Sequence, residues 1–340
     1  MNLIMKAKIL MIRKMIMIII LSIGGGDKLK TITVMVPAYN EEKVLEQFYN
    51  RVFDIMNKIK KYDFELLFIN DGSTDKTLDI IKALREKDKR ITYVDLSRNF
   101  GKEIAMSAGF DYVRGDSVII MDADLQDPPE LIPEMVELWE RGYDDVYGKR
   151  SSREGESWIK KTSSYVFYRV LEKVSKVPIQ TDTGDFRLLS SKALESLKQL
   201  RETQRYTKGL FSLIGHKKIA IEYVRAPRAA GKTKWNYLKL INLAIEGITS
   251  FTTIPLRISS ILGFQISLLS FLYMLKVIIE KLFFNSSIPG YPSLMSVILF
   301  LGGIQLIGLG IIGEYLARVF NETKQRPLYF INEYSGEKDE

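Results

Sequence analysis

Residues 117–130 read SVIIMDADLQDPPE and join a short apolar run to a cluster of carboxylates. A short apolar run bounded by turn-forming residues is typical of a buried strand. Pro128 and Pro129 stiffen the chain directly after the carboxylates, and a helix can begin at Pro129. This stretch predicts a strand over Ser117 to Met121 that ends in an acidic loop and leads into a helix.

The same order of elements recurs on both sides of this stretch. The predicted strands are Thr31 to Val36, Phe64 to Ile69, Ile91 to Asp95, Ser117 to Met121 and Asp145 to Tyr147. Segments with helix-like spacing follow four of them. Alternating strands and helices imply a mostly parallel sheet covered by helices on both faces, with ligands at the carboxyl ends of the strands. The expected fold class is therefore α/β and Rossmann-like.

Beyond Tyr147 the pattern is less regular, and it completes a domain expected to span residues 31–230. The elements predicted there are a polar loop from Gly148 to Gly155, a helix around Trp158 to Val174, a strand near Phe186 to Leu189, a helix near Lys192 to Leu200 and a strand at Lys218 to Val224.

Two apolar segments follow. Ile258 to Leu275 has 18 residues without a charge, and Leu294 to Gly313 has 20 with Gln305 as its one strongly polar residue. Each is long enough to cross a bilayer. The linker between them is rich in proline, glycine and other turn formers. Residues 253–317 therefore predict a hairpin of two transmembrane helices.

The flanks of this hairpin indicate its orientation. Lysine and arginine are concentrated before the first span and after the second, which places the α/β domain and the tail, residues 318–340, in the cytoplasm. Just before the hairpin, Trp235 to Phe251 has helical spacing of apolar residues and several lysines near its start. We expect an interfacial helix over residues 231–252, with an ordinary amphipathic surface helix as the alternative.

Residues 1–30 form a basic and apolar leader. Its apolar core, Met15 to Ile23, is too short to span a membrane, and it lacks a clear cleavage pattern. Three interpretations stay open: an over-long start that adds nothing to the fold, an anchor lying on the membrane surface, and a signal segment.

Composition and charge exclude several chemistries. The chain has no cysteine and one histidine, which excludes thiolate zinc sites and makes a Ser-His-Asp triad improbable. The net charge of +8 is the sum of +5 over residues 1–30, −8 over residues 31–140, +11 over residues 141–252, +1 over residues 253–317 and −1 over residues 318–340. Nucleic acid would require a more continuous basic face. An acidic half followed by a basic half suits a metal-bound anion beside an anionic lipid surface.

The acidic loop is the clearest candidate site. Alternation along an extended chain sends Asp122 and Asp124 to the same side, where both can bind one hard cation. Gln126, two residues further, can add an oxygen. All-oxygen ligation suits Mg²⁺ or Mn²⁺, which keep positions for diphosphate oxygens. A solvated acidic turn that caps the next helix is the alternative for such a motif taken alone.

Two other strand ends carry polar clusters. VPAYNEE, residues 36–42, ends the first strand, and INDGSTD, residues 69–75, ends the second. Carboxylates and amides there can bind a uracil-type base and ribose hydroxyls, and Tyr39 can cover the ring. Taken singly, these residues are ordinary helix caps and turns.

Taken together, the motifs resemble family 2 glycosyltransferases of the GT-A fold, and most closely the polyprenyl-phosphate group of dolichol-phosphate-mannose synthases and bactoprenol glucosyltransferases. The resemblance covers about residues 31–325. Besides the three motifs above, it rests on LSRNFGKE (96–103), YGKR (147–150), TGDFRLLS (183–190), QRYTKG (204–209) and RAAGKTKW (228–235).

The resemblance implies inverting transfer of a sugar from a nucleotide sugar to a polyprenyl phosphate at the cytoplasmic membrane face. It assigns donor contacts to Pro37, Tyr39, Glu41 and Asp71, and the metal to Asp122, Asp124 and Gln126. Lys102 is a further donor-side candidate, with a solvated helix-start lysine as the alternative. UDP-glucose is the favoured donor, and UDP-N-acetylglucosamine, GDP-mannose and a modified arabinose donor stay open.

The attacking phosphate needs its charge held, which suits arginine. The expected acceptor ligands are Arg150 and Arg187, followed by Arg205 and Lys208. Asp185 is expected to orient these groups and to take part in catalysis, with a structural cap or ion pair as its alternative. Gln305 and Glu314 are costly in lipid and favour helix contacts or a homo-oligomer.

Two competing functions make different demands. A processive glycan synthase of the same superfamily usually has more spans and a Q-x-x-R-W motif, whereas here Gln204 is followed directly by Arg205 and Tyr206. A membrane-anchored scaffold that binds nucleotide sugars without catalysis predicts decayed acidic and arginine motifs, and those of this chain are intact.

Overall fold

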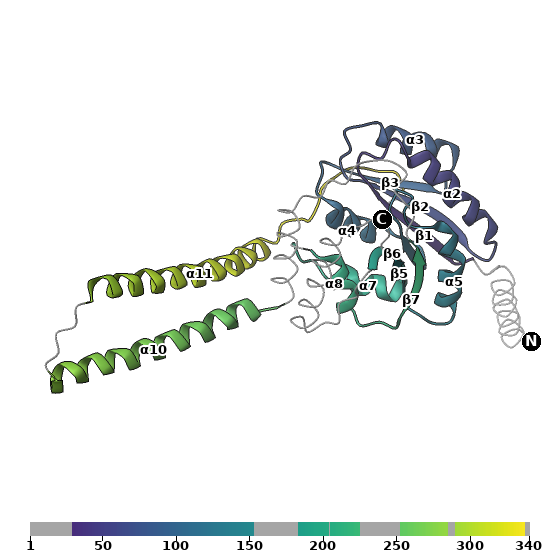
Figure 1. The fold of residues 1–340 in the computed structure, drawn as a ribbon. Coiled ribbons are helices and arrows are strands. Elements are labelled where there is room, and N and C mark those ends of the chain that lie inside the picture. Colours follow the sequence, from purple (N-terminus) through teal and green to yellow (C-terminus); the bar gives the residue numbers. More distant parts are fainter. Residues whose placement is uncertain (1–28, 153–182, 204, 225–251, 285–289, 337–340) are drawn as a thin grey trace, which may run out of the picture.

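A computed structural model describes residues 29–152, 183–203, 205–224, 252–284 and 290–336. It consists of an α/β domain from which two long helices extend side by side (Figure 1). The predicted helix at Trp158 to Val174, the interfacial helix of residues 231–252 and most of the 1–30 leader lie outside the described residues.

The domain is built on one mixed sheet of eight strands in the order β7-β5-β6-β4-β1-β2-β3-β8. β1, β2, β3 and β4 are parallel, while β6 is antiparallel to β4 and β5, and β8 is antiparallel to β3. The strands are β1 (Thr31–Ala38), β2 (Asp63–Asn70), β3 (Ile91–Leu96), β4 (Ser117–Ile120), β5 (Asp145–Ser152), β6 (Thr183–Ser190), β7 (Lys218–Val224) and β8 (Ile331–Tyr334).

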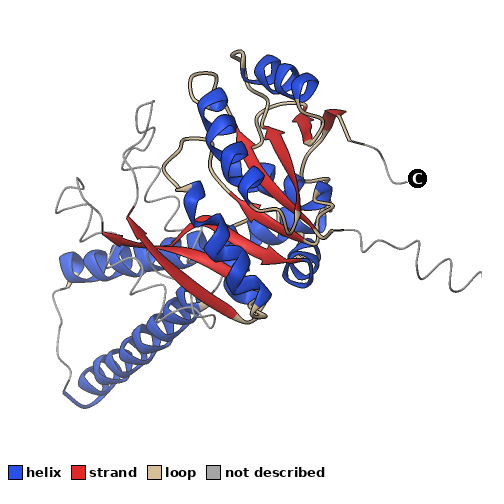
Figure 2. Ribbon diagram, turned by 90° about the vertical axis from the view of Figure 1, so that its right-hand side faces the viewer, coloured by secondary structure: helices blue, strands red, loops and turns tan. Residues whose placement is uncertain are grey.

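Helices cover both faces of this sheet, as Figure 2 shows. One face packs against α2 (Leu45–Lys58), α3 (Thr77–Lys87), the short helix η1 (Pro129–Leu131) and α5 (Ile132–Glu140). The other packs against α4 (Lys102–Tyr112), α7 (Ser191–Lys198) and α8 (Thr207–Leu213).

The central strand explains this layering. In β1, Val34 and Val36 face one core and Met35 faces the other, and all three side chains are fully buried. A strand with apolar residues on both faces is stable only between two helical layers, as in other parallel sheets. The predicted α/β class with flanking helices is confirmed.

The structure differs from the sequence prediction in three places. β5 continues to Ser152, through half of the predicted polar loop, because Lys149 and Arg150 pair with β6 or β7. The helix α8 was not predicted, and neither was β8, which lies in the region predicted as a tail. Four residues are too few for a clear period-two pattern, and β8 is stabilised by pairing with the distant β3.

The C-terminal hairpin consists of α10 (Ile254–Phe284) and α11 (Tyr291–Thr323). Their apolar windows, Ile254–Ile279 and Leu294–Thr323, have mean hydropathies of 1.9 and 2.3 and are not buried within the protein. The Tyr315 hydroxyl donates to the Thr252 carbonyl at 2.7 Å, which joins the two helices at their domain end. Length and composition therefore suit both helices to a membrane.

A buried ion pair lies inside the domain. The Arg187 guanidinium on β6 is 3.0 Å from a carboxylate oxygen of Asp145 on β5, and both side chains are almost completely buried. The guanidinium also lies over the Phe211 ring, 3.6 Å from its centroid. Burial lowers the pKa of Arg187, and the negative charge of Asp145 opposes that change. The pair therefore joins β5, β6 and α8.

Removing one partner of this pair tests its structural role. Asp145→Asn leaves the Arg187 charge buried without its counter-ion, and we expect the free energy of unfolding to fall by about 3–5 kcal/mol. Denaturant titration of the purified protein in detergent, followed by tryptophan fluorescence, measures the change. Glu195→Gln is the matched control, because its ion pair with Lys198 is exposed and contributes at most about 1 kcal/mol. Equal losses in the two variants would contradict the assignment.

Candidate active site

The predicted site residues gather at one edge of the sheet. Asp71 and Asp122 follow β2 and β4, and Pro37 and Tyr39 lie at the end of β1. Because β6 is antiparallel to β4, its first residues, including Asp185, reach the same edge. Strand polarity alone thus brings together motifs that are more than 100 residues apart in the chain.

Lys102 joins the two halves of this edge. Its ammonium is 2.6 Å from a carboxylate oxygen of Asp122 and 2.6 Å from one of Asp185. Lys102 is the first residue of α4, so three different segments meet at one cation. Lys102 therefore holds the acidic loop against β6, and its described contacts are with the predicted catalytic carboxylates.

These three charges stabilise one another. Burial acts to lower the pKa of Lys102, but the charges and hydrogen bonds of Asp122 and Asp185 outweigh it and raise that pKa. Burial acts to raise the pKa of Asp185, but Lys102 and then Lys208 outweigh it and hold that pKa well below its usual range. Asp185 and Lys102 therefore stay charged throughout the physiological pH range.

The acidic loop has a tightly defined backbone. The backbone amide of Gln126 donates to Asp124 Oδ1 at 3.1 Å, which closes a turn across Leu125. Leu125 has a φ of 59° and is buried, a conformation that is strained for a branched residue and needs support from the surrounding core. The loop therefore holds Asp122 and Asp124 in fixed positions at the sheet edge.

The donor set of this loop fits a hard divalent cation. Asp122, Asp124 and Gln126 offer two carboxylates and an amide oxygen, the ligands that Mg²⁺ and Mn²⁺ prefer. Within the described part of the chain, no group of three or more His, Cys, Asp and Glu side chains is placed to hold a metal.

The ends of β1 and β2 are locked to each other. The backbone amide of Asn40 donates to Ser73 Oγ at 3.0 Å. The side-chain oxygen Oδ1 of Asn40 accepts from the backbone amide of Thr74 at 2.8 Å. The Glu41 amide donates to Thr77 Oγ1 at 2.8 Å. Asn40 has a φ of 57°, which suits asparagine. These bonds fix VPAYNEE and INDGSTD as one surface.

Asp71 connects that surface to the segment before α4. It is 3% exposed, and its carboxylate accepts the Phe100 amide at 2.7 Å and the Gly101 amide at 3.0 Å. Burial raises the pKa of Asp71, and these two hydrogen bonds oppose the change. Next to it, a Cβ at Gly72 would lie 2.3 Å from the Arg98 carbonyl carbon. The structure thus joins INDGSTD to LSRNFGKE through Asp71 and Gly72.

Of the other predicted donor contacts, Tyr39 is the most accessible. Its side chain is 36% exposed at the end of β1, while Pro37 and Glu41 are partly buried. An exposed aromatic ring beside a polar surface can stack on a base. The predicted donor residues thus lie together, although Asp71 contacts backbone amides of this chain through both of its carboxylate oxygens.

Arg150 lies close to Asp122 and to Gly184, the residue before Asp185. Its Nη2 would be 2.9 Å from a Cβ at Gly184. Burial acts to lower the pKa of Arg150, but a hydrogen bond to Tyr223 and the charges of Tyr223, Asp127 and Asp122 outweigh it and raise that pKa. The Tyr223 hydroxyl donates to Asp127 Oδ1 at 2.7 Å. Tyr223 and Asp127 thus orient Arg150, a role not predicted from the sequence.

Two atoms of this cluster lack a partner in the described part of the chain. Arg150 Nε and Asp185 Oδ1 are both buried without a hydrogen bond. A buried donor or acceptor without a partner costs about 1–3 kcal/mol, so both atoms are available to hydrogen-bond a further group.

The remaining predicted acceptor ligands occupy different environments. Arg187 is 0% exposed and engaged with Asp145, so its burial argues against the predicted contact with an acceptor phosphate. Arg205 donates to the Leu200 carbonyl at 2.5 Å, and burial lowers its pKa. Lys208 lies close enough for its charge to act on Asp185. We therefore retain Arg150 and Lys208 as acceptor candidates and assign Arg187 to the core.

Glu103 is a site residue that sequence reasoning missed. Its carboxylate accepts the Thr207 amide at 2.9 Å and also the Thr207 hydroxyl, which fixes α8 and Lys208 against the start of α4. Burial and then the nearby charge of Asp185 raise the pKa of Glu103. In the sequence, only the position of Glu103 next to Lys102 within LSRNFGKE indicated a role in the site. Its partner Thr207 lies 104 residues away in the chain.

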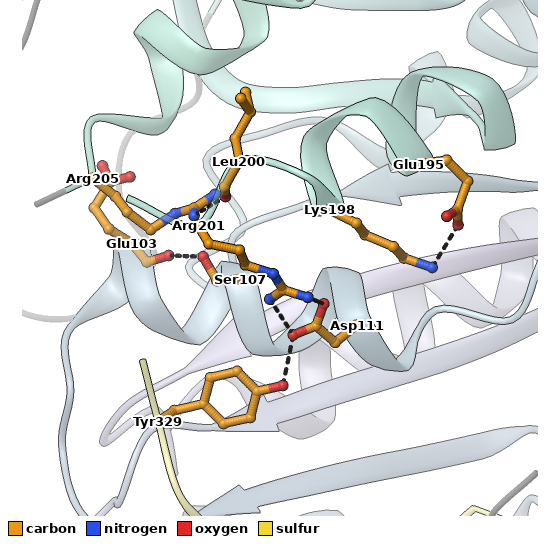
Figure 3. A network of polar contacts seen from close by, with 9 residues as sticks. All are labelled: Glu103, Ser107, Asp111, Glu195, Lys198, Leu200, Arg201, Arg205 and Tyr329. Carbon is orange, nitrogen blue, oxygen red and sulfur yellow. Dashed lines mark hydrogen bonds and ion pairs between the residues drawn. The ribbon is translucent and has the colours of Figure 1, made fainter. Parts of the chain in front are cut away.

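Figure 3 shows the polar network on the outer side of α4. The Asp111 carboxylate accepts hydrogen bonds from Nη1 and Nη2 of Arg201, at 2.7 Å each, and from the Tyr329 hydroxyl at 2.7 Å. Glu103 lies nearer the start of α4, and its backbone carbonyl accepts a hydrogen bond from the Ser107 hydroxyl. The same helix therefore carries Lys102 at its start and a link to the chain after α11 at its end.

Two family models match this chain. The family described as Glycosyl transferase family 2 matches residues 33–198, and the GtrB C-terminal hairpin matches residues 254–319. The first match covers the acidic loop, Lys102 and Asp185, and the second covers most of α10 and α11.

Several relatives are similar over most of the chain. An uncharacterized glycosyltransferase of Synechocystis is 47% identical over 90% of this chain and 96% of its own length. A bactoprenol glucosyl transferase of Shigella phage SfV is 46% identical over 88% of this chain and 97% of its own. A prophage bactoprenol glucosyl transferase homolog of Escherichia coli is 45% identical over 88% of this chain and 98% of its own.

Among solved structures, glucosyl-3-phosphoglycerate synthase of Mycobacterium tuberculosis with Mn²⁺, UDP-glucose and phosphoglyceric acid has a TM-score of 0.43 at 20% identity, over 65% of this chain and 78% of that chain. That likeness is too low to add to the fold or the function. The two family matches and the relatives at 45–47% identity suffice: the chain belongs to glycosyltransferase family 2, in the group that carries the GtrB C-terminal hairpin.

Proposed function

We propose that this glycosyltransferase moves a sugar from a nucleotide sugar, with UDP-glucose favoured, to the phosphate of a polyprenyl phosphate such as undecaprenyl phosphate. The product is a lipid-linked sugar for envelope glycosylation. The observation that carries the proposal is the cluster of Asp122, Asp185, Lys102 and Arg150 at a sheet edge, in a chain with a two-helix apolar hairpin. Relatives named as bactoprenol glucosyl transferases, similar over nearly their whole length, support the acceptor class.

The proposed reaction is a single displacement. An oxygen of the acceptor phosphate forms a bond to the anomeric carbon as the bond from that carbon to the donor diphosphate breaks, which inverts the configuration and releases the nucleoside diphosphate. The acceptor is a phosphate monoester with a second pKa of about 6, so at neutral pH it is mostly ionised and needs little help from a general base.

The main task of the protein is therefore to hold charges in place. Arg150 is fixed by Tyr223 and can hold the acceptor phosphate, because a guanidinium binds two phosphate oxygens at once. Lys208, held near Asp185 by the Glu103 to Thr207 bonds, adds a second positive charge. Asp185 keeps Lys102 in position and remains ionised throughout.

We propose Asp122, Asp124 and Gln126 as the ligands of Mg²⁺ or Mn²⁺. Such an ion, when bound, stabilises the negative charge that develops on the leaving diphosphate. Lys102 is paired with one carboxylate oxygen of Asp122, so a metal ion at this site would share the Asp122 carboxylate with Lys102. The donor base and ribose would lie on the surface formed by VPAYNEE and INDGSTD, with Tyr39 against the base.

The proposed location is the cytoplasmic face of the membrane, with two spans. The chain leaves the α/β domain for α10 and returns from α11 to pair β8 with β3, so both flanks of the hairpin are on the side of the domain. Two spans return the chain to the side of the membrane from which it entered, as the pairing of β8 with β3 requires. The excess of lysine and arginine on that side supports the cytoplasmic assignment.

Asp124→Asn tests the metal assignment. The change keeps the shape of the side chain but removes a charged oxygen ligand, and we expect kcat/KM to fall about 100-fold or more. The assay follows release of nucleoside diphosphate from a panel of nucleotide sugars, with and without undecaprenyl phosphate and Mn²⁺. Asp54→Asn, an exposed carboxylate on α2, is the matched control. Glycosylation at the wild-type rate in Asp124→Asn would show that the metal is held elsewhere.

The pH dependence separates acceptor ionisation from enzyme ionisation. Below a pH of about 6 the acceptor phosphate binds a proton, and we expect the rate to fall about tenfold per pH unit. Asp185 has a lowered pKa and Lys102 a raised one, so neither changes charge in this range. Replacing the acceptor by the corresponding polyprenyl phosphonate, which has a higher second pKa, should move the acidic limb to higher pH. A limb that does not move must come from an enzyme group.

A further inference from the structure

The chain after the second apolar helix returns to the α/β domain and binds along its edge. We call residues 324–336 the strap. Its β8 adds to β3 in antiparallel register, and the Ser97 amide donates to the Phe330 carbonyl at 2.9 Å. Ser335 exchanges bonds with Tyr93, whose amide donates to Ser335 Oγ at 2.8 Å. The strap is therefore an ordered part of the sheet.

One side chain of the strap reaches a buried polar chain. Asn332 Nδ2 donates to Asp95 Oδ2 at 3.1 Å, and Asp95 Oδ1 accepts from Asn70 Nδ2 at 2.6 Å. Asn70 is 1% exposed and Asp95 is 7% exposed. Asn70 Oδ1 in turn lies 3.4 Å from the Ser73 amide, which donates to it. Four residues thus link the strap to the INDGSTD loop.

The strap is also fixed at its membrane end. Tyr329 donates to Asp111, which holds Arg201 through two bonds (Figure 3). Just before the strap, Glu322 at the end of α11 accepts the Thr203 amide at 2.8 Å. Arg201 and Thr203 belong to the connection that leads to Arg205 and α8. Tyr329 and the preceding Glu322 therefore join this end of the strap to the connection between α7 and α8, Tyr329 through Asp111 and Glu322 directly at Thr203.

From these contacts we infer that the strap positions the donor-binding loop and that Asn332 and Asp95 act as positioning residues for the nucleotide. This inference rests on the proposed function, in which INDGSTD contacts the donor. Asn332 binds one carboxylate oxygen of Asp95, and the other oxygen binds the side-chain amide of Asn70. Asn70 in turn accepts the Ser73 amide and stands at the start of the loop that contains Asp71 and Ser73. Donor affinity thus depends on residues that follow the membrane hairpin.

Physical chemistry favours this role for Asp95. A buried carboxylate keeps its position only while its oxygens are hydrogen-bonded, and Asn332 supplies one of the two bonds described. Binding sites lose affinity when a contact group shifts by a fraction of an ångström to an ångström. Asn332 itself is exposed on an edge strand, so replacing it leaves the core packing intact.

The experiment compares three variants of the full-length protein in detergent. Asn332→Ala removes the bond to Asp95, and Asn332→Asp places a second carboxylate against it. Glu333→Gln is the matched control, since Glu333 is the next residue of β8 and pairs with Lys82 and Tyr93 instead. The measurements are the Kd for UDP and for GDP with Mn²⁺, the donor KM and kcat, and the thermal midpoint of unfolding.

We expect the loss of one hydrogen bond in Asn332→Ala to raise Kd and donor KM about threefold to tenfold. Asn332→Asp should raise them further, with kcat and the thermal midpoint close to those of Glu333→Gln. Wild-type Kd and KM in both Asn332 variants, or an equal rise in Glu333→Gln, would overturn the inference. A wild-type protein that neither binds the nucleotides nor transfers a sugar would instead count against the proposed function.

Discussion

The Lys102 ammonium lies 2.6 Å from both Asp122 and Asp185, and the arrangement of the whole site depends on this contact. It joins the start of α4, the loop after β4 and the start of β6. Two carboxylates this close would repel each other without a cation between them. Because the lysine is at the first position of α4, every contact that fixes that helix also fixes Asp122 and Asp185.

Several contacts fix α4 in this position. Asp71 accepts the amides of Phe100 and Gly101 directly before the helix, and Glu103 in its first turn binds Thr207. The outer end of α4 holds Asp111, which is bound to Arg201 and Tyr329. The helix therefore lies between the proposed donor side, the proposed acceptor side and the chain that returns from the apolar hairpin. A disturbance at any of these three places can reach Lys102.

Much of the fold was predictable because its signals are local. Strand β1 is buried on both faces, and the two 18–20-residue apolar runs need no distant partner to be recognised. The acidic loop could be predicted as a site because Asp122 and Asp124 alternate along one extended segment. The role of Arg187 could not be read in this way, because the sequence does not reveal that Asp145 and Phe211 enclose it.

The amino-acid order alone was enough to identify the α/β class, the apolar hairpin and the residue types able to bind a metal and a phosphate. It did not reveal which of those residues are engaged with each other. Lys102 lies 83 residues from Asp185, and Asn332 lies 237 residues from Asp95. The first kind of pair forms because parallel strands bring their carboxyl ends to one edge of the sheet, and the second because the returning strand β8 pairs alongside β3. Periodicity records which face a side chain occupies, whereas its partner is set by the packing of distant segments.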